Sequence, residues 1–146
     1  MRVWLLHGVA ALMLALFLTS LPDCRRTEMS VKVVNESIYA LTSVKLAPYS
    51  EDQADQAAAL DAASNLLPVD AEGYTISLDS GRTSSTFVKF DEDVVIGAVT
   101  FFVDGVYQQY VQYVPLDLSD APEGAVLVMR VIRDDVNAAQ IYFEYE

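Results

Sequence analysis

From residue 30 to the C-terminus, short runs of β-branched and aromatic residues place apolar side chains at every second position. Turn-forming residues separate these runs at regular intervals. Such alternation buries one side of an extended segment and is typical of strands in antiparallel sheets. The pattern predicts strands at residues 31–34, 38–47, 74–78, 86–90, 95–103, 106–114, 126–133 and 140–145.

Three details of these strands are also predicted. The dipeptide Asp104-Gly105 readily takes the positive φ angles of a type I′ turn, so it joins its two flanking strands in a hairpin. In the last strand, Ile141, Phe143 and Tyr145 face the same way. In the second strand, one face is expected to carry Ile38, Ala40, Thr42, Val44 and Leu46.

Residues 51–64 interrupt the β pattern and predict a short helix. Ser50 is expected to cap it, with Gln53 at the capping-box position, and Asn65 is expected to end it. Its apolar face is mostly alanine around Leu60, so the helix is expected to cover a sheet edge or the mouth of the sandwich.

Seven to eight short strands with one helical insertion predict an antiparallel β-sandwich, Ig-like or C2-like, over residues 30–146. A closed barrel is the main alternative. Residues 25–29 are expected to be a linker, and residues 1–24 a separate segment.

The N-terminal segment has the organisation of an export signal, with Met1-Arg2, an apolar stretch over residues 3–18 and a break at Pro22. The expected location is therefore the bacterial cell envelope or the medium. The stretch is also long enough to span a bilayer as an uncleaved anchor, an interpretation that Arg25 and Arg26 favour. A start at Met29 would instead make the protein cytoplasmic.

Cys24 is the only cysteine, and its place after the apolar stretch resembles the lipid-modified cysteine of bacterial lipoproteins. The preceding Leu21-Pro22-Asp23 departs from the small residue found there in lipoproteins. The alternative is that Cys24 lies at the edge of a discarded or spanning segment.

Charge and missing side chains exclude several functions. With 9 basic and 21 acidic residues the net charge is -12, which repels nucleic acid and anionic lipid alike. Contact with a membrane is therefore expected only through the N-terminal segment or a lipid at Cys24. His7 is the only histidine and lies in that segment, so Ser-His-Asp and Cys-His catalysis cannot be assembled in the body, and we expect no enzyme.

An acidic cluster is the candidate metal site. If sandwich loops bring acidic residues together, their hard oxygens suit calcium, whereas the simpler interpretation is a solvated turn whose charges keep sheet edges soluble. The residues concerned are Asp79, Asp91, Glu92, Asp93, Asp134 and Asp135.

Three tyrosines, Tyr107, Tyr110 and Tyr113, crowd one strand and form the candidate binding surface for a sugar or a protein. The simpler interpretation is that tyrosine suits half-buried strands. The triplet Asn35-Glu36-Ser37 matches a glycosylation acceptor, but behind a bacterial N-terminus the match is taken as chance.

Four short segments resemble a loosely defined group of small exported bacterial β-sandwich proteins, mostly of unknown function. The segments are Val34-Asn35-Glu36-Ser37-Ile38, Ala47-Pro48, Asn65-Leu66-Leu67-Pro68 and residues 73–78. The resemblance implies a sandwich fold and no particular activity.

The predicted function is a non-catalytic binding or structural module of the cell envelope with a protein or glycan partner. The alternatives are a calcium-dependent version of this module and a carboxylate-based hydrolase.

Overall fold

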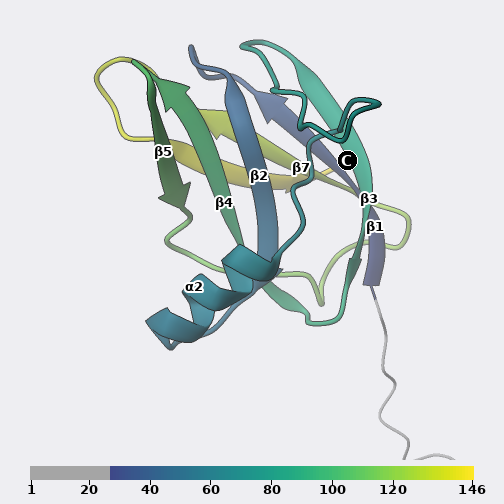
Figure 1. Ribbon diagram of the computed structural model, residues 1–146. Helices are drawn as coiled ribbons and strands as arrows, with labels where there is room; N and C mark the ends of the chain where they lie inside the picture. The colour runs from purple at the N-terminus through teal and green to yellow at the C-terminus, as the bar shows by residue number, and fades with distance from the viewer. Residues whose placement is uncertain (1–26) are drawn as a thin grey trace, which may run out of the picture.

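The computed structural model describes residues 27–146, which form two packed β-sheets and one short helix (Figure 1). The β1 sheet has the strand order β3-β1-β7-β8, and the β4 sheet has the order β2-β4-β5, with β6 paired to the start of β4. The elements are β1 Thr27–Asn35, β2 Leu41–Pro48, α2 Gln53–Ala62, β3 Thr83–Phe90, β4 Val94–Val103, β5 Val106–Val111, β6 Leu116–Asp117, β7 Val126–Ile132 and β8 Gln140–Tyr145. Within residues 27–146 the sheets do not close into a barrel, so the two-layer prediction is confirmed.

One strand pair is parallel, contrary to the expected antiparallel sheets. Strands β1 and β7 run side by side in the same direction, with Val31 opposite Leu127, whereas all other pairs are antiparallel. The reason is that the chain leaves the end of β1 for the other sheet instead of turning back in a hairpin. Strand β1, which begins at Thr27 inside the expected linker, therefore has neighbours from distant parts of the chain.

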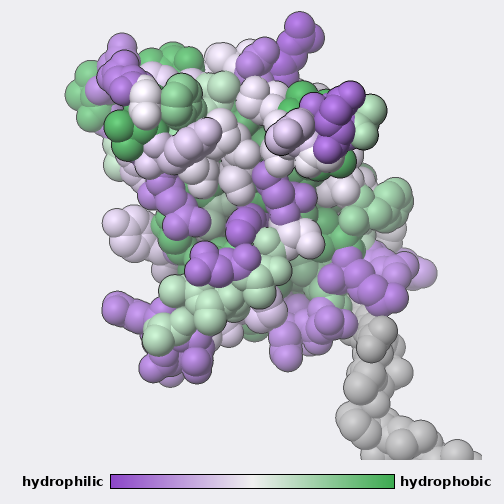
Figure 2. Space-filling model, viewed as in Figure 1, coloured by the Kyte–Doolittle hydropathy of each residue, from purple (hydrophilic) through white to green (hydrophobic). Residues whose placement is uncertain are grey.

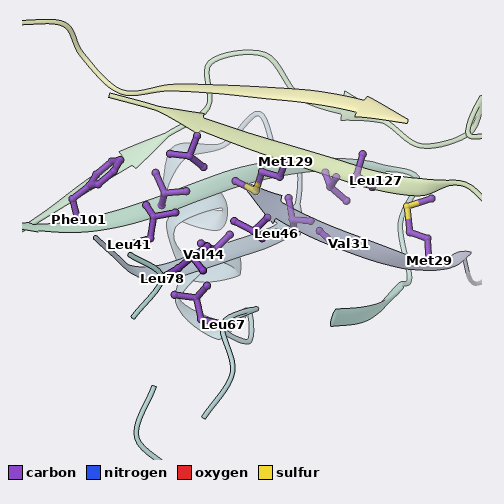
Figure 3. Close-up of a cluster of buried hydrophobic side chains, with 14 of the residues drawn as sticks. Met29, Val31, Leu41, Val44, Leu46, Leu67, Leu78, Phe101, Leu127 and Met129 are labelled. Atoms are coloured by element: carbon purple, nitrogen blue, oxygen red, sulfur yellow. The ribbon is translucent and has the colours of Figure 1, made fainter. Parts of the chain in front are cut away.

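The core lies between the sheets and is built from the inward side of each strand (Figure 3). Strand β1 contributes Val31 and Val33, β4 contributes Val99 and Phe101, and β7 contributes residues such as Met129, all at most 1% exposed. Alternate side chains of β8 close the rim, because Ile141, Phe143 and Tyr145 pack against this core as expected.

Strand β2 departs from strict alternation. The register between β2 and β4 shifts between Leu41 and Ser43, so Leu41, Val44 and Leu46 face the core. The expected face is therefore confirmed at Val44 and Leu46 but wrong before the bulge, where Leu41 lies in the core and Ile38 is 52% exposed. A bulge changes which face the next residue occupies, a change that alternation in the sequence does not reveal.

Helix α2 is shorter than expected and has a different cap. The carboxylate of Asp52 accepts the N–H groups of Ala54 at 2.9 Å and Asp55 at 3.0 Å, so Asp52 is the N-cap residue. The predicted cap, Ser50, instead accepts the N–H of Asp52 on its hydroxyl and donates its own N–H to the side chain of Gln56. Aspartate caps helices as well as serine does, and Asp52 directly precedes the first helical residue, so its carboxylate reaches the unpaired N–H groups.

The far end of α2 is held by the β4 sheet. The ammonium of Lys45 donates to the carbonyl of Leu60 at 2.9 Å and to that of Asp61 at 3.3 Å. The helix also packs its buried Leu60 on Ala47, Ile96 and Ala98 of the sheet. The helix therefore covers the outer face of the sheet over β2 and β4, and the expectation that it covers a sheet edge or the mouth of the sandwich is wrong.

The strand expected at residues 74–78 is wrong. Tyr74 is 73% exposed, and the segment makes only isolated bridges, between Val69 and Thr75 and between Leu41 and Leu78. The amide of Asn65 accepts the N–H of Val44 at 3.0 Å, and the chain from there runs beside β2. This segment covers the free edge of β2, so its alternating residues serve as an edge cover.

The hairpin β4–β5 is confirmed, with φ of 51° at Asp104 and 81° at Gly105. Its second strand ends at Val111, three residues earlier than expected. The side-chain oxygen of Gln112 accepts the N–H of Gly97 at 3.1 Å, in the place of a backbone carbonyl, and the chain then leaves the sheet. Strands β7 and β8 lie within one residue of their predicted bounds, and β3 begins three residues earlier than predicted, at Thr83.

Candidate binding surface

The outer face of the β4–β5 hairpin carries exposed apolar side chains. Tyr107 is 69% exposed, Phe102 47% and Val111 40%. Gln109 is also exposed and lies between Tyr107 and Val111 on the same side of β5. The rings of Phe102 and Tyr107 are 5.0 Å apart at 49° to each other. We call Phe102, Tyr107, Gln109 and Val111 the hairpin face; apolar residues gather at its upper end in Figure 2.

A groove runs from the hairpin face to helix α2. It has a volume of about 490 Å³. Its floor is Gln109 and Val111, and its wall is Gln53, Gln56 and Ala57. The contacts at both ends of α2 described above therefore also position the wall of the groove.

The three predicted tyrosines are separated by the structure. Only Tyr107 lies on the hairpin face. Tyr110 points inward, is half-buried and packs edge-on against Phe101 with centroids 5.7 Å apart. Tyr113 follows the end of β5 and is 99% exposed. Alternation along the strand explains this result, since residue 110 must face away from residue 107.

Arg133 forms a site that the sequence did not predict. Its guanidinium lies 4.8 Å from the ring centroid of Tyr39 and 4.9 Å from those of Phe101 and Tyr110. Its Nη2 donates to the side chain of Gln108 at 2.7 Å, while Nε and Nη1 are buried without a hydrogen-bond partner. The surrounding rings supply the electron-rich faces that stabilise such a cation.

The rim of this site is acidic. The hydroxyl of Tyr39 donates to the carboxylate of Asp135 at 2.7 Å, and this hydrogen bond raises the pKa of Tyr39 above its ordinary value. The contacts of the Arg133 guanidinium with the three rings, and its hydrogen bond to Gln108, link the end of β7 to the β4 sheet. We therefore assign Arg133 a structural role, and a lone arginine after a strand gave no signal of it in the sequence.

The predicted calcium residues are divided between the two ends of the sandwich. Asp91, Glu92 and Asp93 follow the end of β3, which lies beside the start of β1, because Phe90 pairs with Thr27. Asp79 precedes β3, and Asp134 and Asp135 follow β7, both beside the end of β1. The length of β1, roughly 27 Å at 3.3 Å per residue, separates the two groups. The predicted cluster is therefore wrong.

The carboxylates at the β7 end have internal partners. Asp134 accepts the N–H of Asn137 at 2.6 Å, the side-chain amide of Asn137 at 2.7 Å and the N–H of Val136 at 2.9 Å. These bonds hold the pKa of Asp134 below its ordinary value. In the described part of the chain, no group of three or more histidine, cysteine or acidic residues is arranged to hold a metal ion.

Asn35 of the glycosylation-like triplet is part of the interior. Its amide donates to the carbonyls of Tyr39 at 2.9 Å and Leu78 at 2.8 Å, and its oxygen accepts both the N–H and the hydroxyl of Ser37. Asn35 is fully buried, so its amide is inaccessible in the folded protein. The network joins the turn after β1 to the segment that covers β2.

Three of the predictions concern residues outside the described range, namely the signal segment, the lipid at Cys24 and the histidine at position 7. Within residues 27–146, no helix is long and apolar enough to cross a bilayer. Comparison with known proteins adds no relative, since no family model, curated protein or solved structure matches the chain.

Proposed function

We propose that this protein is a non-catalytic binding module of the bacterial cell envelope that holds a protein partner on the hairpin face. The N-terminal segment exports it, and that segment or a lipid on Cys24 keeps it at the membrane. The Ig-like or C2-like assignment of the sandwich belongs to this proposal and rests on the strand number and the two sheets.

The observation that carries the proposal is the exposure of the hairpin face. Large apolar side chains are rarely grouped on the surface of a monomer unless they contact something. Tyrosine is also enriched at the energetic centres of protein interfaces, where one ring fills a pocket and its hydroxyl is hydrogen-bonded. Tyr107 is exposed beside Phe102, with a groove at the other end of the strand, so its ring is available for such a contact.

A protein partner fits this face better than a sugar. Sugar rings stack on flat aromatic platforms, whereas the rings of Phe102 and Tyr107 are tilted by 49° and form a ridge. A ridge beside a groove suits the side chains of another protein. Residues 105–116 carry no charged side chain, so the contact favours a partner surface that is also uncharged where it meets β5.

The experiment is capture of envelope proteins on the immobilised full chain. We expect Tyr107→Ser to weaken retention of the specific partner by about tenfold, as for a central interface residue. The matched control is Phe87→Ser, because Phe87 is an aromatic side chain 83% exposed on the other sheet. Retention that Tyr107→Ser leaves unchanged, or that Phe87→Ser abolishes equally, contradicts the proposal.

A further inference from the structure

The edges of the two sheets are protected in different ways. The edge of β2 is covered, since the N–H of Leu66 donates to Val44 and Leu78 pairs with Leu41. The edge strand β3 carries Lys89, which pairs with Glu28 at 3.0 Å. Charges and covering segments are the usual devices that stop sheet edges from pairing with other chains.

Strand β5 has none of these devices. Residues 105–116 contain no aspartate, glutamate, lysine or arginine, although residues 27–146 contain 26 such residues, 20 acidic and 6 basic. Figure 1 shows β5 at the outer side of the β4 sheet, with no strand beyond it. This uncharged strand is the exception among the described edges.

The register shows which backbone groups β5 presents. The N–H of Gln112 donates to the carbonyl of Gly97 at 2.8 Å, so residues 106, 108, 110 and 112 direct their backbone groups to β4. In an antiparallel ladder the alternate residues direct theirs the other way. The N–H and C=O groups of Tyr107, Gln109 and Val111 therefore point away from the sheet.

We infer that β5 pairs with β5 of a second copy of this chain, antiparallel and centred on Gln109. This inference rests on the proposed function, because it names the partner of the hairpin face. In this register Tyr107 lies opposite Val111 of the second copy and Gln109 opposite Gln109, with about six backbone hydrogen bonds between the strands. Aromatic residues opposite β-branched ones are favourable pairs on a sheet.

Two further features fit a second copy. The pairing strand is free of charge, so two acidic molecules meet without carboxylates facing each other across the seam. The register also brings Tyr107 of the second copy beside Val111, at the open side of the groove whose wall is Gln53, Gln56 and Ala57. Each groove thereby receives one ring, as twofold symmetry requires.

The test is the oligomeric state of the purified full chain in mild detergent by analytical ultracentrifugation. We expect a dimer, and we expect Gln109→Lys to raise its dissociation constant by more than about tenfold, because two like charges then face each other. Ser85→Lys is the matched control, since Ser85 is an exposed residue of the edge strand β3. It should leave the dimer intact, and melting curves should show both variants folded.

A covalent test fixes the register. In a Cys24→Ser background, Gln109→Cys should form an intermolecular disulfide on mild oxidation and Ser85→Cys should not, since Cα atoms of directly opposed residues lie about 5.5 Å apart. A wild-type chain that stays monomeric up to about 100 µM, or a dimer that Gln109→Lys leaves unchanged, overturns the inference. If the chain is a monomer that still captures an envelope protein through Tyr107, the dimer inference is contradicted but the proposed binding function is not.

Discussion

At the scale of single residues, Arg133 is the most unusual feature of the protein. Two of its guanidinium nitrogens are buried without hydrogen-bond partners, which ordinarily costs free energy. Three aromatic rings within 4.9 Å offset this cost through their electron-rich faces. Planarity matters here, because a guanidinium can stack against several rings at once and an ammonium cannot.

We therefore expect Arg133→Lys to lower the free energy of unfolding by about 1–2 kcal/mol, although the positive charge is kept. Urea denaturation followed by tyrosine fluorescence measures the change. Arg82→Lys serves as control, since Arg82 is exposed and the substitution should change stability by less than about 0.5 kcal/mol. An equal effect of both substitutions would mean that the rings do not stabilise Arg133.

At the scale of elements, helix α2 depends on contacts at its two ends. Its sequence is rich in alanine and it buries only Leu60, so packing contributes little to its stability. The carboxylate of Asp52 at one end and the ammonium of Lys45 at the other satisfy backbone groups that the helix leaves unpaired. Because α2 forms the wall of the groove, these two residues also shape the candidate binding surface.

Replacement of the cap should be measurable. We expect Asp52→Ala to destabilise the protein by about 1 kcal/mol, the usual cost of removing an N-cap side chain. Hydrogen exchange should show the increase in opening concentrated in residues 53–62. The neighbouring Glu51→Ala, also an exposed acidic residue, should leave exchange in the helix nearly unchanged. Uniform acceleration across the whole domain would instead show that α2 is not a separate unit.

The elements also show what the sequence could predict. The hairpin was predictable because Asp104-Gly105 determines both its turn and its register. Strand β2 was predicted on the wrong face at Ile38, because a bulge follows Leu41 and no residue type marks it. The exposure of Tyr107 was predicted correctly. The prediction of a calcium site was wrong, because the relative direction of β3 and β7 depends on tertiary structure and is not encoded in any local residue pattern.

At the scale of the whole molecule, charge is distributed unevenly. Residues 27–146 contain 20 acidic and 6 basic residues, and most of the basic ones are used internally. Lys32 pairs with Glu146 at 3.0 Å, and Arg130 bonds both Glu36 and Glu144. The remaining carboxylates repel one another, which opposes the compact state.

Salt should therefore stabilise the protein. We expect the melting temperature to rise by about 3 °C between low ionic strength and 0.3 M NaCl, because screening weakens the repulsion more than it weakens exposed ion pairs. KCl should give the same shift, and calcium chloride at equal ionic strength should give no more than magnesium chloride. A larger shift with calcium alone would restore a specific calcium site.

The parallel pairing of β1 with β7 has a consequence for how the chain folds. Residues 30–35 stay without one of their two neighbours until residues 126–131 have been synthesised. Contacts between segments so far apart in sequence slow folding, because a long loop must close before the contact forms. The β1 sheet of this polypeptide is therefore completed only after its last strands have been synthesised. Until then the chain is expected to stay largely unfolded, which is the state in which a polypeptide can pass through a membrane pore.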